Sequence, residues 1–194
     1  MIEKFLEGNK RFIENDFKKD IGYYQTLAKG QSPTALFIAC SDSRVNPERI
    51  TGAKMGEIFV HRNIGNLVPR EDLNLATVLE YAVNHLKVKD LVVCGHSDCG
   101  AMKALDAGAK GDVYIPKWLA NASDVKEKAD AAMKPATTEE EAKARKRFIE
   151  IENIRAQVEN LKTYPVVKKA VDEGRVTLHG LYYSLENGDL SKVV

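Results

Sequence analysis

The chain has 194 residues, a length that suits one domain with a substantial core. Its 29 basic and 28 acidic residues nearly cancel, and the net charge of +1 argues against recognition of nucleic acid or an anionic membrane through bulk charge. Three cysteines do not form a disulfide framework in a chain of this length, and no apolar run is long enough to cross a bilayer. Residues 1–6 do not resemble a signal peptide, so we expect a cytoplasmic protein.

The predicted elements alternate between helices and strands. Apolar side chains spaced among charges predict helices over residues 1–30, an arm that covers its own domain or a neighbouring subunit. Short apolar runs with polar or glycine neighbours predict buried strands at 34–39, 57–60, 90–94 and 176–182. Helical patterns at about 72–87 and 98–106 separate the strands. The expected fold class is therefore α/β, with a mainly parallel central β-sheet flanked by helices.

A stretch rich in Ala, Lys and Glu, at about 109–163, is predicted to be a helical insertion and not a linker. Threonines at 137 and 138 precede three glutamates, a pattern that favours a helix N-terminus. The many charges of this stretch are typical of a solvated helical face. We expect one domain over 1–194, made of the arm 1–30 and a core 31–194.

Two short motifs carry candidate metal ligands, and each follows a predicted strand. Cys40 begins Cys-Ser-Asp-Ser-Arg, and His96 and Cys99 belong to His-Ser-Asp-Cys-Gly. In an open α/β sheet, ligands bind beyond the carboxyl ends of the strands, where these side chains would meet. Two thiolates and one imidazole suit zinc, and a site with three protein ligands keeps a position for water. The motifs predict a zinc hydrolase or hydratase.

Residues next to these ligands are further candidates. Asp42 and Arg44 could form a simple surface salt bridge, but metal ligands and bound water depend on oriented partners, and we interpret the pair as functional. A helix that begins at Gly100 would direct backbone N–H groups toward an anion on the metal. Cys94 lies within an apolar strand and is interpreted as a core residue.

Further segments stand in a characteristic order along the chain. They are Gly-Gln-Ser-Pro at 30–33, Gly-Glu-Ile-Phe-Val-His-Arg-Asn-Ile-Gly-Asn at 56–66, Glu-Tyr-Ala-Val at 80–83, Leu-Lys-Thr-Tyr-Pro at 161–165 and Leu-His-Gly at 178–180. Together with the two cysteine motifs, they resemble the landmarks of the β-class carbonic anhydrases over nearly the whole chain.

The resemblance implies an activity and an assembly. The activity is that of a carbonate dehydratase, a zinc lyase that hydrates carbon dioxide reversibly to bicarbonate and a proton by zinc-bound hydroxide. One Zn²⁺ per subunit would be held by Cys40, His96 and Cys99. The assembly would be a homodimer or a higher even-numbered homo-oligomer, with the N-terminal helices packing on a partner subunit.

The resemblance also implies roles for single residues. The family's aspartate at the position of Asp42 accepts a hydrogen bond from the water or hydroxide on zinc, and Arg44 matches the arginine that holds it. In some members this aspartate becomes a fourth ligand and closes the site. The residues that match the substrate pocket are Gln31, Phe59, Ile64 and Tyr81, with Gln31 and Tyr81 reaching across the dimer interface. Without the family, Phe59 and Ile64 would be ordinary core residues.

Some relatives have a bicarbonate-inhibition site built from a tryptophan, an arginine and a tyrosine. The matching residues here are Phe37, Arg62 and Tyr183. Phenylalanine lacks the indole N–H, so we predict that bicarbonate does not switch this protein strongly.

Two other functions stay open at this point. The same scaffold could hydrolyse carbon disulfide or carbonyl sulfide, because a fold does not fix its substrate. Alternatively, Asp42 or another group could fill the fourth position permanently, which would make the zinc structural. We assign none of His61, His85 and His179 to proton transfer.

Overall fold

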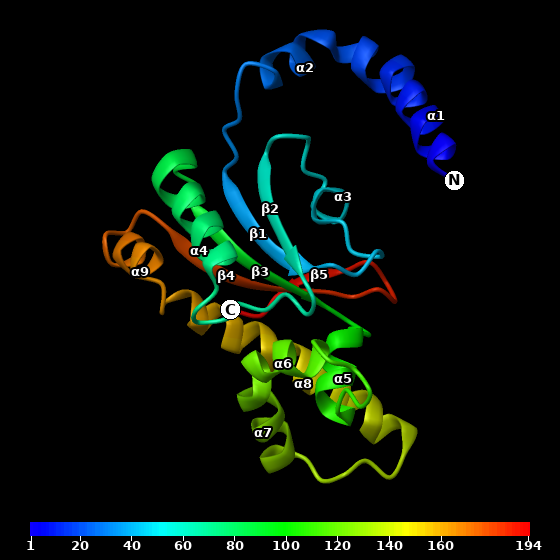
Figure 1. Cartoon of the computed structure of the whole chain (residues 1–194), viewed down its shortest axis with the longest axis vertical. Coiled ribbons are helices and arrows are strands. Elements are labelled where there is room, and N and C mark those ends of the chain that lie inside the picture. The colour runs from blue at the N-terminus through cyan, green and yellow to red at the C-terminus, as the bar shows by residue number, and fades with distance from the viewer. The chain divides into compact units, whose positions relative to one another are not determined.

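The computed structural model describes all residues, Met1–Val194, as two compact units, Met1–Ser32 and Pro33–Val194. The first unit is helical, and Figure 1 shows its two α-helices in blue. Its elements are α1 (Ile2–Phe12), a π-helical turn (Ile13–Phe17), a 3-10 turn (Lys18–Asp20) and α2 (Ile21–Leu27). None of these elements contains a buried residue, and Phe5 and Leu6 are well exposed.

The second unit is built on a five-stranded sheet in the order β2-β1-β3-β4-β5. The strands are β1 (Ala35–Cys40), β2 (Ile58–Asn63), β3 (Asp90–His96), β4 (Thr177–Tyr183) and β5 (Leu190–Lys192). All pairs are parallel except β4 with β5. The predicted α/β fold with a mainly parallel sheet is confirmed. The antiparallel edge strand β5 was missed, because three residues are too few to show a periodicity.

Helices flank this sheet (Figure 1). They are α3 (Pro47–Thr51), α4 (Leu73–Glu80) with a π-helical continuation (Tyr81–Leu86), α5 (Gly100–Ala107), α6 (Ile115–Leu119), α7 (Ser123–Ala132), α8 (Glu139–Leu161) and α9 (Pro165–Asp172). A short 3-10 turn, Ala120–Ala122, joins α6 to α7. The predicted helical insertion thus consists of α6, α7 and α8.

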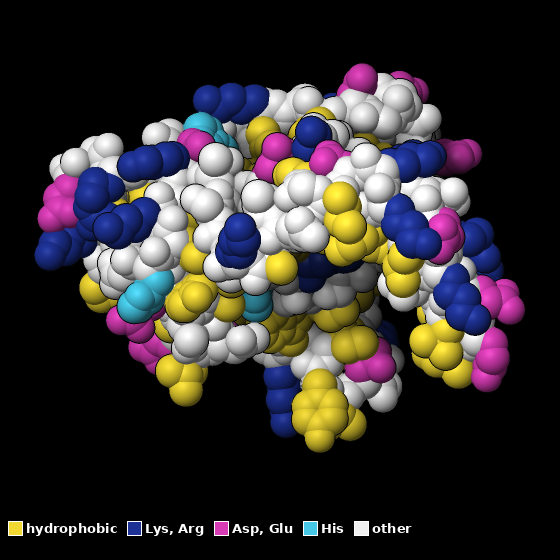
Figure 2. Space-filling view, turned by 90° about the horizontal axis from the view of Figure 1, so that it is seen from above, with side chains coloured by type: hydrophobic (Ala, Val, Ile, Leu, Met, Phe, Trp, Pro, Cys, Tyr) yellow, Lys and Arg dark blue, Asp and Glu magenta, His cyan; other side chains and the backbone are white.

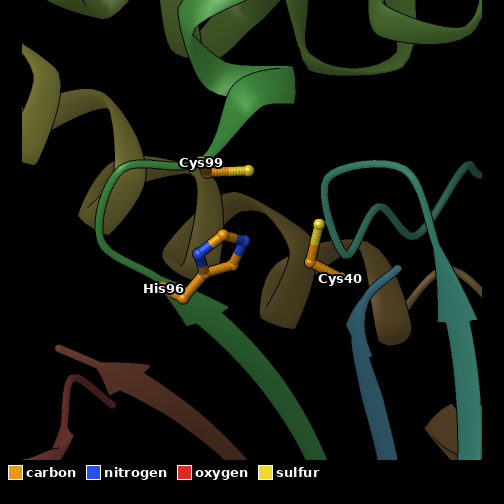
Figure 3. Close-up of side chains that lie close together, drawn as sticks. All are labelled: Cys40, His96 and Cys99. Atoms are coloured by element: carbon orange, nitrogen blue, oxygen red, sulfur yellow. The ribbon is translucent and has the colours of Figure 1, made fainter. Parts of the chain in front are cut away.

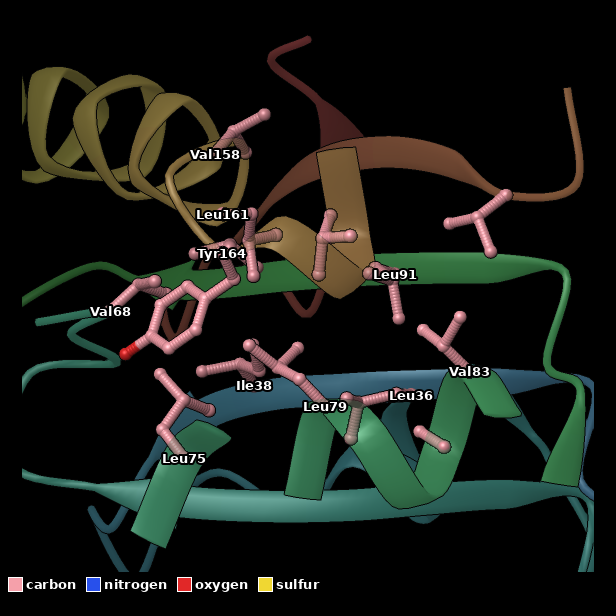
Figure 4. Packing of buried hydrophobic residues seen from close by; sticks show 14 of the residues in the cluster. Leu36, Ile38, Val68, Leu75, Leu79, Val83, Leu91, Val158, Leu161 and Tyr164 are labelled. Atoms are coloured by element: carbon pink, nitrogen blue, oxygen red, sulfur yellow. The ribbon is translucent and has the colours of Figure 1, made fainter. Parts of the chain in front are cut away.

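The largest hydrophobic core lies between the sheet and the helices α4, α8 and α9. Leu36 and Ile38 of β1 point into it and meet Leu75 and Leu79 of α4 (Figure 4). Every residue of β1 is buried, because the alternate side chains of this strand enter a second cluster on the opposite face. Burial on both faces explains why β1 reads as a continuous apolar run and not as an alternating one.

Helix α8 lies close to the strands β3 and β4 because a glycine faces it. A Cβ atom on Gly180 would meet Cγ2 of Ile154 at 2.7 Å, which is closer than real Cβ contacts. The helix begins with a capping box formed by Thr138 and Glu141, as the threonine and glutamate pattern predicted. The interpretation of this stretch as a solvated face fails for Glu150, which is only 3% exposed.

Charged side chains of both signs are interspersed over the face seen in Figure 2. This view agrees with the balanced composition of the chain. No helix combines the length and the apolar character that crossing a membrane requires.

Candidate metal centre

Three predicted ligands meet where adjacent parallel strands end. Cys40 is the last residue of β1, His96 is the last residue of β3, and Cys99 directly precedes α5. Their ligand atoms all lie within 4.8 Å of one another, and all three residues are buried. Figure 3 shows the two sulfur atoms and the imidazole converging on one point. The sheet topology places them there, because β1 and β3 are neighbours and run in the same direction.

The imidazole of His96 is oriented as a metal ligand requires. Its Nδ1 lies 2.9 Å from the carbonyl oxygen of Ser97, which can only accept a hydrogen bond, so Nδ1 carries the proton. In the neutral ring, Nε2 then presents a lone pair. This Nε2 atom is buried and has no hydrogen-bond partner, a costly state that a metal ion would relieve. A donor set of two sulfurs and one imidazole nitrogen fits Zn²⁺.

The two cysteines of the cluster have unlike acidities. The pKa of Cys40 is lowered, chiefly by the neighbouring Cys99 thiol and His96 imidazole and further by the backbone N–H groups of Asp42 and Gly65. The pKa of Cys99 is raised, because this thiol shares its proton with Cys40 and because it is buried. The thiolate is the form that binds metal, so Cys40 is prepared for coordination before the metal arrives.

Cys94, the third cysteine, lies within β3 and outside the cluster. Complete burial raises the pKa of its thiol to about 12. A thiol that stays protonated among apolar neighbours behaves as a small hydrophobic side chain, as the sequence interpretation expected.

Asp42 is held beside the cluster by Arg44. The arginine Nε and Nη2 atoms lie 3.0 Å and 2.7 Å from Oδ1 and Oδ2 of Asp42. Oδ2 of Asp42 is also 3.9 Å from Nε2 of His96. Hydrogen bonds from the guanidinium hold the pKa of Asp42 far below its usual range. The carboxylate is therefore ionised and can only accept hydrogen bonds near the metal centre.

Arg44 lies between two carboxylates, and the second one was not predicted. Nη1 of Arg44 is 3.3 Å from Oδ2 of Asp98. Asp98 also pairs with Lys103 at 2.6 Å and with Lys146 at 2.9 Å, so its own charge is balanced. The position of Asp98 between two ligands, His96 and Cys99, was a signal that could have revealed it.

Glu150 of α8 supports the loop that carries Cys99. Its Oε1 accepts a hydrogen bond of 3.2 Å from the backbone N–H of Cys99, and its Oε2 accepts one of 2.9 Å from the Tyr182 hydroxyl. Burial raises the pKa of this carboxyl group. No sequence pattern singles out Glu150, because it lies 51 residues from Cys99 in a helix rich in glutamate.

Two of the predicted pocket residues, Phe59 and Tyr81, lie at a distance from the Cys40, His96 and Cys99 cluster of the same chain. Phe59 and Tyr81 have ring centroids 6.0 Å apart. Phe59 pairs in register with Leu36, four residues before Cys40 and thus about 13 Å of strand away. The structure therefore brings Phe59 and Tyr81 together, but nearer to the amino-terminal ends of the strands than the ligands are. Gln31 belongs to the first unit, Met1–Ser32.

The other two predicted pocket residues are Ile64 and Gly100, and each is next in the chain to a residue of or beside the ligand cluster. Ile64 directly follows β2 and is 48% exposed. The backbone of its neighbour Gly65 makes a small contribution to the lowered pKa of Cys40. Gly100 is the first residue of α5 and follows Cys99.

Arg62 supports the backbone of the first motif. Its guanidinium donates to the carbonyl oxygen of Cys40 at 2.9 Å and to that of Asp42 at 2.7 Å. Phe37 points to the face of β1 opposite the largest core. Tyr183 pairs in register with His96.

The fold and the cluster define an α/β protein with a three-ligand set suited to a metal ion, and comparisons with known proteins agree with this class. The family model described as "Carbonic anhydrase" matches residues 35–190. A carbonic anhydrase of Pseudomonas aeruginosa is 42% identical over 192 residues, which span 96% of this chain and 85% of the relative. Carbonic anhydrase 1 of Escherichia coli O157:H7 is 37% identical over 98% of this chain and 87% of its own length.

Solved structures give the same result. A Coccomyxa β-carbonic anhydrase in complex with acetazolamide superposes with a TM-score of 0.90 at 34% identity, over 99% of this chain and 86% of that one. A tetrameric β-carbonic anhydrase of Sordaria macrospora superposes with a TM-score of 0.89 at 33% identity, over 98% and 95% of the two chains. The chain therefore belongs to the β-class carbonic anhydrase family and is an enzyme of that class.

Proposed function

We propose that this protein hydrates carbon dioxide reversibly to bicarbonate and a proton, with one Zn²⁺ per subunit held by Cys40, His96 and Cys99. The observation that carries the proposal is the convergence of three ligand atoms within 4.8 Å, one of which is the buried and unpartnered Nε2 of His96. When bound there, zinc supplies a Lewis acid that makes a water molecule nucleophilic near neutral pH.

Asp42 orients the attacking water. Its carboxylate is ionised and is held by Arg44, so it accepts a hydrogen bond from the water and does not donate one. A hydrogen bond from the water to this carboxylate leaves an oxygen lone pair of the water free to point toward the carbon atom of the substrate. The 3.9 Å between Oδ2 of Asp42 and Nε2 of His96 is short enough for this contact beside the ligands.

The substrate lies against apolar side chains. Carbon dioxide is uncharged and has little polarity, so a wall formed by Phe59, Ile64 and Tyr81 with one amide donor from Gln31 suits it. Phe59 pairs in register with Leu36, four residues before Cys40, and Tyr81 lies beside Phe59, so both lie at a distance from the ligands of their own chain. We therefore infer that the complete pocket needs a second subunit. Backbone N–H groups at Gly100, where α5 begins, favour the anionic product.

We infer an even-numbered homo-oligomer in which the arm 1–30 packs on a partner and forms one functional domain with the core 31–194. The exposed apolar side chains of α1, including Phe5 and Leu6, support this assembly. The tetrameric state of the Sordaria macrospora relative supports it as well. We also infer a cytoplasmic location, because the proposed zinc ligands must stay reduced and all three cysteines are free.

Stopped-flow hydration of carbon dioxide tests the proposal, on protein with quantified zinc at pH 7 and again above pH 8. Asp42→Ala should lower kcat/KM by about 10- to 100-fold, the usual effect of losing an oriented partner of a metal centre. Asp112→Ala, in an exposed loop, is the matched control and should keep full activity.

Each other outcome has a defined meaning. Activity only at the higher pH would indicate that Asp42 closes the site at neutral pH. Inactivity of the zinc-loaded protein at both pH values would contradict the proposal and would direct the assay to carbon disulfide and carbonyl sulfide, or to a structural metal. Full activity of Asp42→Ala would refute the role of this carboxylate.

A further inference from the structure

Asp98 has a backbone conformation that is uncommon for a residue with a side chain. Its φ of +60° lies in the left-handed region, which only Asn66 and Lys87 share with it among the residues other than glycine. Asp98 stands between His96 and Cys99, two of the proposed metal ligands. An uncommon backbone conformation that persists beside functional groups is a reason to look for a function of the residue.

The carboxylate of Asp98 is fixed by two helices. Its Oδ1 atom lies 2.6 Å from Nζ of Lys103 in α5 and 2.9 Å from Nζ of Lys146 in α8. Both lysines use the same oxygen, so Oδ2 stays available for another donor. The two helices therefore determine where Oδ2 lies.

Oδ2 of Asp98 faces the guanidinium of Arg44. Nη1 of Arg44 lies 3.3 Å from this oxygen, and Nη2 donates to the main-chain carbonyl oxygen of Asp98, also at 3.3 Å. Another edge of the guanidinium, formed by Nε and Nη2, donates to Asp42 at 3.0 Å and 2.7 Å. The shorter distances indicate that Asp42 is the main partner of Arg44 and that Asp98 holds the outer edge of the guanidinium.

Arg44 needs this second partner because it is half-exposed. Its side chain is 48% exposed, and an exposed ion pair is weak because water and side-chain motion compete with it. A guanidinium that is bound along two edges has fewer orientations than one bound along a single edge. Asp42 lies deeper, with a side chain only 16% exposed and Oδ2 at 3.9 Å from Nε2 of His96. An arginine that stays in place keeps this carboxylate at the metal centre.

We propose that Asp98 is a positioning residue of the metal centre: its carboxylate holds the outer edge of the Arg44 guanidinium, and Arg44 thereby keeps Asp42 beside the metal ligands. Metal centres depend on partners that act through another residue in this way. The step from Arg44 to catalysis rests on the proposed function, in which Asp42 orients the attacking water. The step from Asp98 to Arg44 does not depend on any activity.

The exchange of the Arg44 Nε–H proton with water tests the first step. NMR on isotope-labelled protein measures it, and the Arg44 signal is the one that is absent from Arg44→Gln. Exchange requires the guanidinium to leave Asp42, so the loss of the outer contact should speed it up. We expect an increase of about two- to fivefold in Asp98→Asn, the range that an exposed ion pair corresponds to.

Asp98→Asn is a sharp substitution because asparagine has nearly the same size and also tolerates the left-handed backbone. The two lysines lie closer to the side chain than Arg44 does, so the amide oxygen should stay with them. The NH2 group of the amide should then face Nη1 of Arg44, which places one donor against another.

Asp130→Asn is the matched control. Asp130 of α7 is also an exposed aspartate that pairs with a lysine and an arginine, Lys126 and Arg145, but it lies outside the metal centre. This control should leave the exchange of the Arg44 proton unchanged. Unchanged exchange in Asp98→Asn as well would overturn the proposal.

A double-mutant cycle on the zinc-loaded protein tests the second step. Asp98→Asn should lower kcat/KM for hydration of carbon dioxide by about two- to fivefold in the wild-type chain. In an Arg44→Gln chain it should lower kcat/KM by less than about twofold, because its effect passes through Arg44. Equal losses in both chains would show that Asp98 supports only the loop of the ligands and would refute the proposal. Faster exchange with unchanged kcat/KM would refute it too.

Two further provisions keep the result decisive. If Asp98→Asn does not fold by circular dichroism, Asp98→Gly replaces it, because glycine adopts the left-handed conformation readily and lacks the carboxylate. If the zinc-loaded wild-type protein does not hydrate carbon dioxide, the proposed function fails. Faster exchange in the variant would then still support the step from Asp98 to Arg44, and unchanged exchange would still overturn it.

Discussion

Replacing Tyr182 with Phe removes one hydroxyl group from the contacts that support Cys99. The hydroxyl donates to Oε2 of Glu150 at 2.9 Å, and Oε1 of the same carboxylate accepts the backbone N–H of Cys99. Phe keeps the ring that packs in the core and that Arg147 covers at 5.1 Å. The substitution therefore tests the hydrogen bond without opening a cavity.

The expected cost follows from burial. Tyr182 and Glu150 are each 3% exposed, so water does not replace the lost donor. A hydrogen bond to a charged group contributes about 1.5–3 kcal/mol, and we expect Tyr182→Phe to lower the free energy of unfolding by about 2 kcal/mol. For a chain of this length, that loss lowers Tm by about 4–8 °C.

Urea unfolding at pH 8 measures this change, at one protein concentration because the stability of an oligomer depends on concentration. The control is Tyr183→Phe, which changes the next residue of β4, where the side chain faces the opposite side of the sheet and is only half-buried. The control should shift the free energy of unfolding by less than about 0.5 kcal/mol. A loss of less than about 0.5 kcal/mol in Tyr182→Phe, or equal losses in the two variants, would refute the reasoning.

Three further predictions concern the metal centre. Because Arg44 lowers the pKa of Asp42, their pair stabilises the fold above about pH 4 and loses this effect as pH falls. In metal-free protein, the stability deficit of Asp42→Asn should therefore be largest near pH 7 and shrink below about pH 4; a deficit independent of pH would contradict this. Removal of metal by a chelator should make Cys40 react faster with a thiol reagent, while Cys94 should stay unreactive until the protein unfolds. Peptide mapping of the labelled cysteines measures both reactions. Labelling of Cys94 before unfolding would contradict its burial. Because Phe37 lacks an indole donor, a bicarbonate titration should show no steep loss of activity, and a cooperative loss would disprove that prediction.

The strands and the proposed ligands could be predicted from the sequence because both depend on local patterns. Buried parallel strands read as short apolar runs, and Cys40 and His96 stand at the ends of two of them. Residue type and strand-end position were enough to expect the three ligands together. By contrast, β5 is too short to show a pattern, and Glu150 is one of many glutamates in its part of the sequence.

The sequence by itself determined the residue types of the candidate ligands, the positions of the four parallel strands along the chain and, through its motifs, the family. The tertiary structure alone decided which distant side chains support the site. Glu150 reaches Cys99 across 51 residues, and Lys146 reaches Asp98 across 48. Such contacts depend on how α8 packs beside the sheet. No local periodicity encodes that packing, because it arises only when the separate apolar faces are buried together.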